Sequence, residues 1–178
     1  MNIIVTQRLF IRRFKAEDAA DLFDYLSSPR IPCFKDEKLY SLVEAEIDVA
    51  KRATDPAQFA VCLKETGTLI GHLFADNTNE PDSNTWSVGW HFNQRYEHQG
   101  YASESAAALF DYLFTVKDAR RLYAWVETYN QASQKLCKRL NMRHEGCFKE
   151  FVAFESENGE ARYDDTYIYA LLHKEWSM

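Results

Sequence analysis

Three short apolar segments, a polar loop and a long amphipathic run follow one another, and this succession limits the folds open to the chain more than any other feature. The apolar segments are typical of strands, and a turn at Gly67 joins the first two. The expected strands are Phe59 to Lys64, Leu69 to Ala75 and Thr85 to Phe92. The loop passes through Gly100 into a helix with apolar residues at helical spacing: Ala106, Phe110, Leu113 and Phe114. A meander that leads into a helical crossover is therefore expected.

The segments on either side extend this pattern. Before the meander we expect a strand at Arg8 to Phe14, a helix at Ala16 to Leu26, and a helix within Ser41 to Arg52 with Val43, Ile47 and Ala50 on one face. After the crossover we expect a strand at Arg121 to Glu127, a helix at Asn130 to Leu140, and two long strands around a turn at Asn158-Gly159. The order β-α-α-β-β-β-α-β-α-β-β predicts a mixed α/β fold and a single domain over residues 1–178.

Composition and charge are those of an ordinary globular chain. The 178 residues, 46% of them hydrophobic and 27% charged, are enough to bury most of the unfolded surface. The net charge of −6 argues against a nucleic-acid binder and favours amine partners. No signal peptide or membrane-spanning run occurs, so we expect a cytoplasmic protein without membrane association. Four cysteines without CxxC spacing are expected to be buried thiols that hold no metal: Cys33, Cys62, Cys137 and Cys147.

The polar loop before the crossover helix is suited to an anion, because unpaired N–H groups and the positive end of the helix dipole gather there. A Walker-type phosphate loop is excluded, since no Gly-Lys-Ser/Thr follows at the required spacing. The absence of G-x-G-x-x-G argues against a dinucleotide site. Two alternatives remain open: a turn without a ligand, and a pyrophosphate cradled by backbone amides.

Five segments carry a family resemblance: TQRLFIRRFKAEDAADLFDYLSSP, LKETGTLIGHL, VGWHFNQRYEHQGYASESAAALFDYLF, ETYNQASQKLCKRLNM, and EGCFKE with DDTYIYALLHKEW. In this order they resemble the GNAT acyl-CoA-dependent N-acyltransferases, and within them the RimJ/RimL ribosomal-protein N-terminal acetyltransferases. The resemblance spans nearly the whole chain. It implies the GNAT fold, α/β (mixed α+β), with a central, mostly antiparallel sheet flanked by helices. It also implies transfer of the acetyl group of acetyl-CoA to a primary amine, here a protein N-terminal amino group, by direct attack through a tetrahedral intermediate.

The same resemblance implies residues for the cofactor site. The pyrophosphate cradle falls on five consecutive residues: His98, Gln99, Gly100, Tyr101 and Ala102. Phe92 and Asn93 are implied to pair with the pantetheine arm and to give the oxyanion hydrogen bond. Asn130 and Ser133 are implied to lie on the CoA side. Asn130 can equally be a helix N-cap, and Ser133 can equally be a solvent-facing serine.

Departures from the family pattern bear on the mechanism. Glu97 and Gln99 stand at loop positions where Gln, Arg or another basic residue is common, and Cys137 stands where many GNATs have the tyrosine that protonates the leaving thiolate. We therefore expect Ser133 to hydrogen-bond to the thioester sulfur and Cys137 to be packed. Glu150 is the candidate base, and the alternative is an exposed strand glutamate paired with a lysine.

Acceptor and partners are less defined by the sequence. His72 and His91 fall on meander strands and are expected to be packed residues rather than catalysts. The loops DNTNEPDSN and ESENGE can steer a cationic acceptor or can be solvated acidic surface. Two other functions stay open: an enzyme for a small amine such as a polyamine or aminoglycoside, and a non-catalytic acyl-CoA sensor. A homodimer is also left open.

Overall fold

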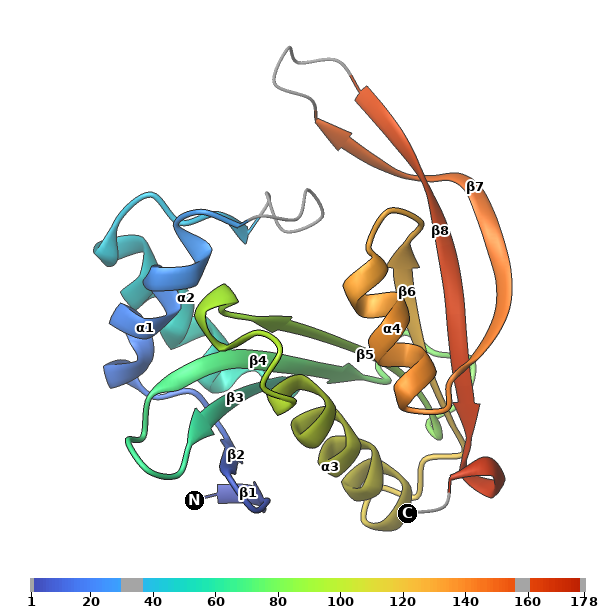
Figure 1. Cartoon of the computed structure of the whole chain (residues 1–178), viewed down its shortest axis with the longest axis horizontal. Coiled ribbons are helices and arrows are strands. Elements are labelled where there is room, and N and C mark those ends of the chain that lie inside the picture. The colour runs from blue at the N-terminus through green and yellow to red at the C-terminus, as the bar shows by residue number, and fades with distance from the viewer. Residues whose placement is uncertain (1, 30–36, 156–160, 177–178) are drawn as a thin grey trace.

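A computed structural model describes residues 2–29, 37–155 and 161–176. Its strands form one sheet in the order β1-β2-β3-β4-β5-β6-β8-β7, in which β5 and β6 are parallel and the other neighbours antiparallel (Figure 1). The strands are β1 (Asn2–Val5), β2 (Leu9–Arg12), β3 (Gln58–Leu63), β4 (Leu69–Asp76), β5 (Thr85–Phe92), β6 (Arg121–Glu127), β7 (Arg143–Glu155) and β8 (Ala161–Leu172). The helices are α1 (Ala19–Leu26), α2 (Leu42–Thr54), α3 (Tyr101–Thr115) and α4 (Gln131–Arg139). The predicted fold class is confirmed.

Alternation along β3 separates two hydrophobic cores, one on each face of the sheet. Phe59 and Val61 belong to the core that α3 and α4 cover, whereas Ala60 and Cys62 belong to the core under α1 and α2. Because successive side chains of a strand point to opposite faces, each face of the sheet is covered by its own pair of helices. The central strands β4 and β5 therefore have a different environment on each side.

Helix α2 forms where it is predicted but buries another face. The Ser41 hydroxyl caps it by accepting a hydrogen bond from a first-turn N–H at 3.2 Å. The buried residues are Ala45 and Val49. The residues expected to face the core are exposed instead: Val43, Ile47 and Ala50. Helix α2 packs on α1, and its two buried residues share one core with the buried residues of α1.

The N-terminal region differs from the prediction at the element ends. Strand β1 is not expected from the sequence, because four residues carry too little periodicity. The helix expected from Ala16 starts with a 3₁₀ turn, Ala16–Asp18, before α1. Asp18 fixes this turn, because its carboxylate accepts the N–H of Lys15 at 2.8 Å and forms a buried ion pair with Arg12 at 2.7 Å.

The expectations for the cysteines are confirmed in part. Cys62 and Cys137 are buried as expected, whereas Cys147 is exposed on the edge strand β7. Cys33 and the turn at Asn158-Gly159 lie outside the described residues. In the part of the chain that the structure describes, no helix is both long and apolar enough to cross a membrane.

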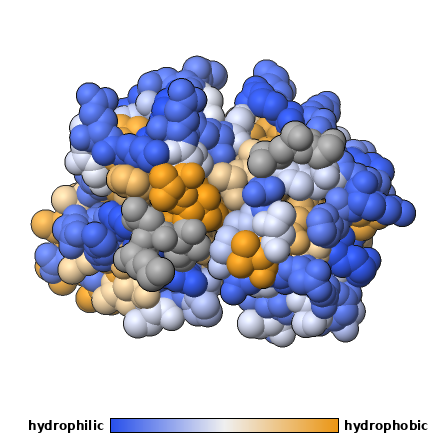
Figure 2. All heavy atoms as spheres, turned by 90° about the horizontal axis from the view of Figure 1, so that it is seen from below, coloured by the Kyte–Doolittle hydropathy of each residue, from blue (hydrophilic) through white to orange (hydrophobic). Residues whose placement is uncertain are grey.

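The surface around β1 and the end of α3 is mostly hydrophilic. Figure 2 shows this face, which lies at the bottom of Figure 1, as largely hydrophilic with hydrophobic residues in several separate small areas. Val5 of β1 and Val116, directly after α3, are exposed hydrophobic residues of these elements. Scattered single residues of this kind are normal on a protein surface.

Candidate active site

The two parallel strands at the centre of the sheet separate along their length. β5 and β6 are paired only at Thr85–Arg121, Trp86–Leu122 and Ser87–Tyr123, although both strands continue beyond these pairs. Farther on, β5 runs beside β4 and β6 beside β8, so the two strands diverge (Figure 1). Within the described residues, no strand pairs with the facing edges of this opening. Such edges can pair with an extended ligand.

Phe92 directs its peptide group into this opening. The N–H of the next residue, Asn93, donates to the Ile70 carbonyl of β4 at 2.9 Å. Because alternate residues of a strand point their peptide groups to opposite edges, the N–H of Phe92 points away from β4 and towards the opening. The Asn93 side chain is occupied as well, since its Nδ2 donates to Asp24 at 2.8 Å and its Oδ1 accepts the N–H of Arg95 at 3.0 Å. Of the two residues expected to give the oxyanion hydrogen bond, Phe92 is the one placed to do so through its N–H.

Gly71 on β4 makes room for Phe92. A Cβ atom at this position would lie 2.6 Å from the Phe92 ring and 2.6 Å from the carbonyl oxygen of His91. A glycine is therefore required here by close approach rather than by backbone conformation. The position of the Phe92 ring, and of the strand edge that carries it, depends on this glycine.

The loop before α3 has the backbone of an anion site. Gly100 is the N-cap of α3 with φ +82°, a conformation that favours glycine. The first intrahelical hydrogen bond runs from the Glu104 N–H to the Gly100 carbonyl at 3.0 Å. Three N–H groups precede it and are the orphan donors of the helix: Tyr101, Ala102 and Ser103. His98 has φ +61° and a side chain that is 95% exposed, so its backbone rather than its imidazole shapes the loop.

Arg8 ties this loop to the start of β2. Its Nη1 donates to the Gln99 carbonyl at 3.0 Å, its Nε donates to Glu104 at 2.7 Å, and its guanidinium carbon lies 4.4 Å from the centroid of the Tyr101 ring. Burial of Glu104 opposes its ionisation, but hydrogen bonds from Thr6 and Arg8 outweigh this effect and lower the pKa of the carboxyl group. The charged Glu104 therefore helps to fix the first turn of α3.

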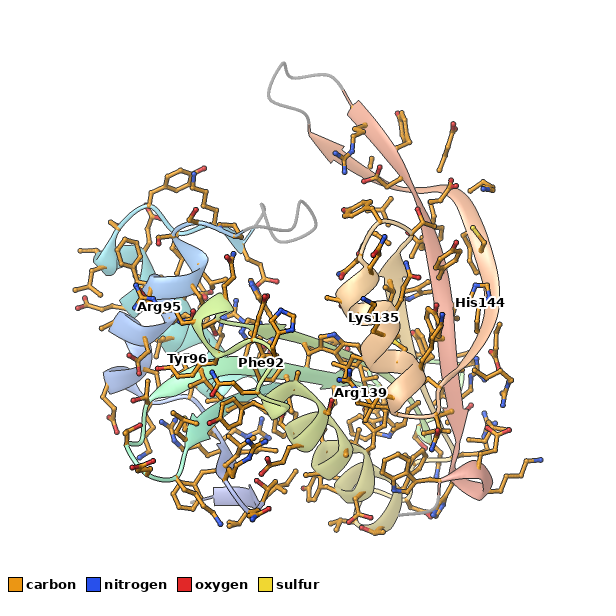
Figure 3. All side chains as sticks on the ribbon, in the orientation of Figure 1. Phe92, Arg95, Tyr96, Lys135, Arg139 and His144 are labelled. Atoms are coloured by element: carbon orange, nitrogen blue, oxygen red, sulfur yellow. The ribbon has the colours of Figure 1, made fainter. Side chains whose placement is uncertain are left out.

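Two basic residues of α4 flank the loop, and sequence reasoning missed both. Lys135 and Arg139 are exposed and four residues apart, so they lie on one face of α4. Figure 3 shows them on the side of α4 that faces α3 and β5, whereas His144 lies on β7, away from this region. Arg139 Nη1 donates to the Ser103 hydroxyl at 2.8 Å. The spacing was visible in the sequence, but its meaning depends on α4 lying beside α3.

Glu97 keeps its acidic side chain at the start of the loop. Its carboxylate lies 3.9 Å from His98 Nε2. Arg95, which lies two residues before Glu97, pairs with Asp24 at 3.1 Å. Asp24 also holds the Asn93 side chain, so it gathers the polar groups that follow β5.

Ser133 lies across the opening from β5. Its hydroxyl oxygen accepts a hydrogen bond from Trp90 Nε1 at 3.1 Å, which links the first turn of α4 to β5. With the indole as donor, the serine keeps its own O–H to donate to a further acceptor. Asn130 is buried, and its Oδ1 caps α4 by accepting the Ser133 N–H at 3.1 Å. Asn130 therefore holds the turn that presents Ser133, which is the N-cap alternative foreseen from the sequence.

Cys137, the residue in the tyrosine position of the family, belongs to the core. It is fully buried among the apolar residues under α3 and α4, as expected. Burial raises the pKa of its thiol to about 12. A group of this kind is a poor proton donor and has no access to the opening.

Glu150 is not brought next to Ser133. It lies on β7, and β8 separates that strand from β6. Its φ of +49° is unusual for a residue other than glycine and falls within an irregular stretch of the β7–β8 pairing. Asp165 supports this conformation by accepting the Glu150 N–H at 3.0 Å and the Lys149 ammonium at 2.7 Å. The structure groups the loop, Phe92 and Ser133 around the opening and leaves Glu150 on the hairpin.

Known proteins resemble this chain in sequence and in fold. Residues 8–143 match the family model of the acetyltransferase (GNAT) domain. YnaD, an uncharacterised N-acetyltransferase of Bacillus subtilis (strain 168), is 34% identical over 176 residues, which are 98% of this chain and 99% of YnaD. The crystal structure of a GNAT-family acetyltransferase from Bacillus anthracis is 29% identical with a TM-score of 0.86, covering 97% of this chain and 99% of that one.

A structure from Vibrio cholerae, described as a proposed ribosomal-protein-serine acetyltransferase, is 25% identical with a TM-score of 0.77 over 95% of this chain and 96% of that one. Sequence relatives and solved structures thus agree over almost the full length. These similarities agree with the diverging strands β5 and β6 and with the glycine loop before α3. The chain belongs to the GNAT family of acetyltransferases and is an acetyl-CoA-dependent N-acyltransferase.

Proposed function

We propose that the enzyme acetylates a primary amine at a protein N-terminus, and that the amine attacks the acetyl thioester directly in the opening between β5 and β6. The observation that carries this proposal is the placement of the Phe92 N–H on one wall of the opening and of Ser133 on the other. A tetrahedral intermediate needs a donor for its oxyanion and a second donor for the departing sulfur. Phe92 and Ser133 supply these two donors.

The cofactor binds on the α3/α4 side in this proposal. The N–H groups from Gly100 to Ser103 hold the pyrophosphate, and Lys135 and Arg139 add charge for the phosphates. The pantetheine arm pairs with the edge of β5 that carries Phe92. The whole chain, residues 1–178, acts as one catalytic domain, because the hairpin of β7 and β8 continues the sheet beyond β6.

An aromatic surface supports a polypeptide acceptor. Trp125 stacks on Phe151 with ring centroids 4.9 Å apart, and Phe148 lies 5.2 Å from both rings. These three residues are 37%, 49% and 43% exposed in the order named. Trp125 alternates with the buried residues of β6, so it lies on the sheet face opposite α4. An apolar surface of this size suits the side chains that follow an N-terminal amine better than it suits a small polar amine.

The identity of the general base and the role of the acidic loops in attracting the acceptor remain predictions. Glu150 is the candidate base, and its unusual φ supports a functional role because strained residues cluster at functional sites. Asp82 pairs with Arg120 at 3.0 Å, and Glu80 accepts the Tyr123 hydroxyl at 2.5 Å, so part of the acidic loop is neutralised locally. If the remaining acids steer a cationic acceptor, the transfer rate falls as ionic strength rises.

The test is thiol release from acetyl-CoA with three acceptors at equal concentration. These are lysine-free peptides with a free N-terminus, the same peptides with a blocked N-terminus, and spermidine. We expect kcat/KM for the free peptides to exceed that for spermidine at least ten-fold, with no release from the blocked peptides. Preference for spermidine would make the acceptor a small amine. Binding of acetyl-CoA without release in every arm would indicate a sensor.

A further inference from the structure

The face of the sheet opposite α3 and α4 carries a cluster of side chains that the proposed chemistry does not use. His72 of β4 and His91 of β5 are cross-strand neighbours, and Glu37, which precedes α2, approaches both. One ligand atom from each of the three residues lies within 4.8 Å of the other two. His72 Nε2 and Glu37 Oε2 are 3.7 Å apart. Three segments that are distant in sequence thus place two imidazole nitrogens and a carboxylate oxygen close together.

Both imidazoles are neutral and can donate a lone pair. Burial lowers the pKa of His91 to about 4 and that of His72 well below its usual range, and the charge of Arg52 adds to both shifts. The Tyr25 hydroxyl is 2.9 Å from His72 Nδ1. With Nδ1 donating to Tyr25, the lone pair of Nε2 faces Glu37. Metal-binding histidines are oriented by second partners in the same way.

The charges near the cluster leave room for a cation. Arg52 donates to Glu37 at 2.9 Å and to Asp48 at 2.6 Å, so two carboxylates share one guanidinium and one negative charge remains. The positive charge of Arg52 disfavours a nearby dication, but Asp48 remains a partner of Arg52 when Glu37 turns away. Glu37 can therefore turn to a bound cation while Arg52 keeps a partner.

We propose that Glu37, His72 and His91 bind a divalent transition-metal ion of the Zn²⁺ class, with a water molecule in the fourth position. Two imidazole nitrogens and one carboxylate oxygen are a donor set that Zn²⁺ favours. Around a tetrahedral ion with bonds of about 2.1 Å, ligand atoms lie about 3.4 Å apart, close to the 3.7 Å between His72 and Glu37. A primary ammonium would need acceptors about 4.7 Å apart, so the spacing of this pair favours a metal ion.

The proposed metal site is separate from the cofactor site, but adjacent residues of β5 contribute to the two sites. His91 directly precedes Phe92, and the two side chains lie on opposite faces of β5. The inference rests on the cluster alone and does not depend on the identity of the acceptor. It departs from the sequence-based expectation that His72 and His91 are packed residues, and it adds a metal ion to a chain for which the sequence predicted none.

The test is calorimetric titration of ZnCl₂ into the full-length protein after dialysis against EDTA. We expect one saturable site per chain with a Kd in the micromolar range or tighter. His91→Gln should weaken binding at least ten-fold, whereas His144→Gln, which changes an exposed histidine on β7, should leave it unchanged.

A second readout separates this site from the cysteines and from misfolding. Titration with CoCl₂ should give a visible absorption spectrum without a thiolate charge-transfer band, because no cysteine is a ligand. Glu37→Gln, at a partly exposed position, provides a variant whose fold is less at risk than that of His91→Gln. The proposal is overturned by the absence of saturable Zn²⁺ binding, by unchanged binding in both variants, by a thiolate band, or by binding of methylammonium in place of Zn²⁺.

Discussion

The two faces of the sheet at β5 differ in the kind of group that they offer to a ligand. On the α3/α4 face, the donors are mainly backbone N–H groups, at the Gly100 loop and at Phe92, supported by the hydroxyl of Ser133. On the α1/α2 face, the groups are the side chains of His72, His91 and their partners. Exposed N–H groups can be hydrated when no ligand is bound, whereas buried polar side chains must find partners inside the protein. Tyr25 and Arg52 are such partners.

This difference predicts how each face responds to substitution. An amide site tolerates changes of side chain, as the unusual Glu97 and Gln99 suggest, but it is sensitive to backbone changes. A buried cluster of side chains is sensitive to changes of side chain, because removal of one member leaves a polar partner without a hydrogen bond. The predictions that follow test the cofactor face, the strand between the two faces, and a position that belongs to neither site.

Ser133→Ala should have the largest effect on turnover, because the proposed mechanism assigns to Ser133 the hydrogen bond to the departing sulfur. We expect kcat to fall about ten- to a hundred-fold, about 1.4–2.7 kcal/mol, with little change in KM for acetyl-CoA. A hydrogen bond to sulfur strengthens as charge develops there, so its loss acts on the transition state. Steady-state kinetics of Ser133→Ala and of the buried control Cys137→Ala provide the measurement. An inactive Cys137→Ala beside a fully active Ser133→Ala would transfer the donor role to the cysteine.

Gly71→Ala should disturb the strand between the two faces. The added methyl group would meet the Phe92 ring and the His91 carbonyl at 2.6 Å, and relief of such overlap costs about 1–3 kcal/mol of unfolding free energy. Gly89→Ala on the paired strand is the matched control, because its nearest neighbours lie at 3.9 Å. Urea denaturation of the two variants checks this expectation. Equal stability of both variants would mean that β4 does not position Phe92 by close contact.

Arg139→Gln should weaken the cofactor site without abolishing it. The variant loses one charge beside the loop but keeps the amide donors, so we expect acetyl-CoA affinity to fall about three- to ten-fold. The loss should shrink in high salt. Lys138→Gln, also exposed on α4, is the charge-matched control. If the two variants bind acetyl-CoA equally well, Arg139 contributes nothing specific and the amides act without it.

Glu145 of β7 should give the smallest effect, since it belongs to neither site. Hydrogen bonds from Arg121 and then Arg143 hold the pKa of this carboxyl at about 2, although burial opposes the shift. Because the folded-state pKa lies below the usual value, the stabilisation is present above about pH 4.5 and is lost as the pH falls towards 2. The Tm difference between wild type and Glu145→Gln should therefore be a few degrees or less at pH 7 and should vanish near pH 2. A difference that is constant with pH would exclude this linkage.

Much of the fold follows from local sequence patterns. The strands Thr85–Phe92 and Arg121–Glu127 match their predicted bounds, because turn residues and apolar runs define both ends. The buried face of α2 could not be predicted, since Val43 and Ile47 form the more apolar stripe and only the packing against α1 selects Ala45. Strand β1 depends on its pairing with β2 and has little signal of its own.

The site residues likewise divide into those with a local sequence signal and those brought together only by the tertiary structure. The Gly100 loop and the turn at Asn130 and Ser133 have local signals: a glycine before a helix, and a capping residue three positions before a serine. The charges of Lys135 and Arg139 acquire meaning only when α4 lies beside α3. The pairing of His72 with His91 arises only from the register of β4 and β5. Groups brought together by tertiary structure leave no spacing rule in the sequence.

The central claim is that the Gly100 loop binds acetyl-CoA through its backbone, and calorimetric titration of acetyl-CoA into Gly100→Val and Gly67→Val tests it most directly. Both glycines have left-handed φ, +82° and +76°, so both substitutions strain the backbone alike, but Gly67 lies in the turn between β3 and β4 with nothing within 4 Å. We predict that Gly100→Val weakens binding ten-fold or more, about 1.4 kcal/mol, and that Gly67→Val binds as wild type does. Unchanged affinity in a folded Gly100→Val variant would contradict the claim.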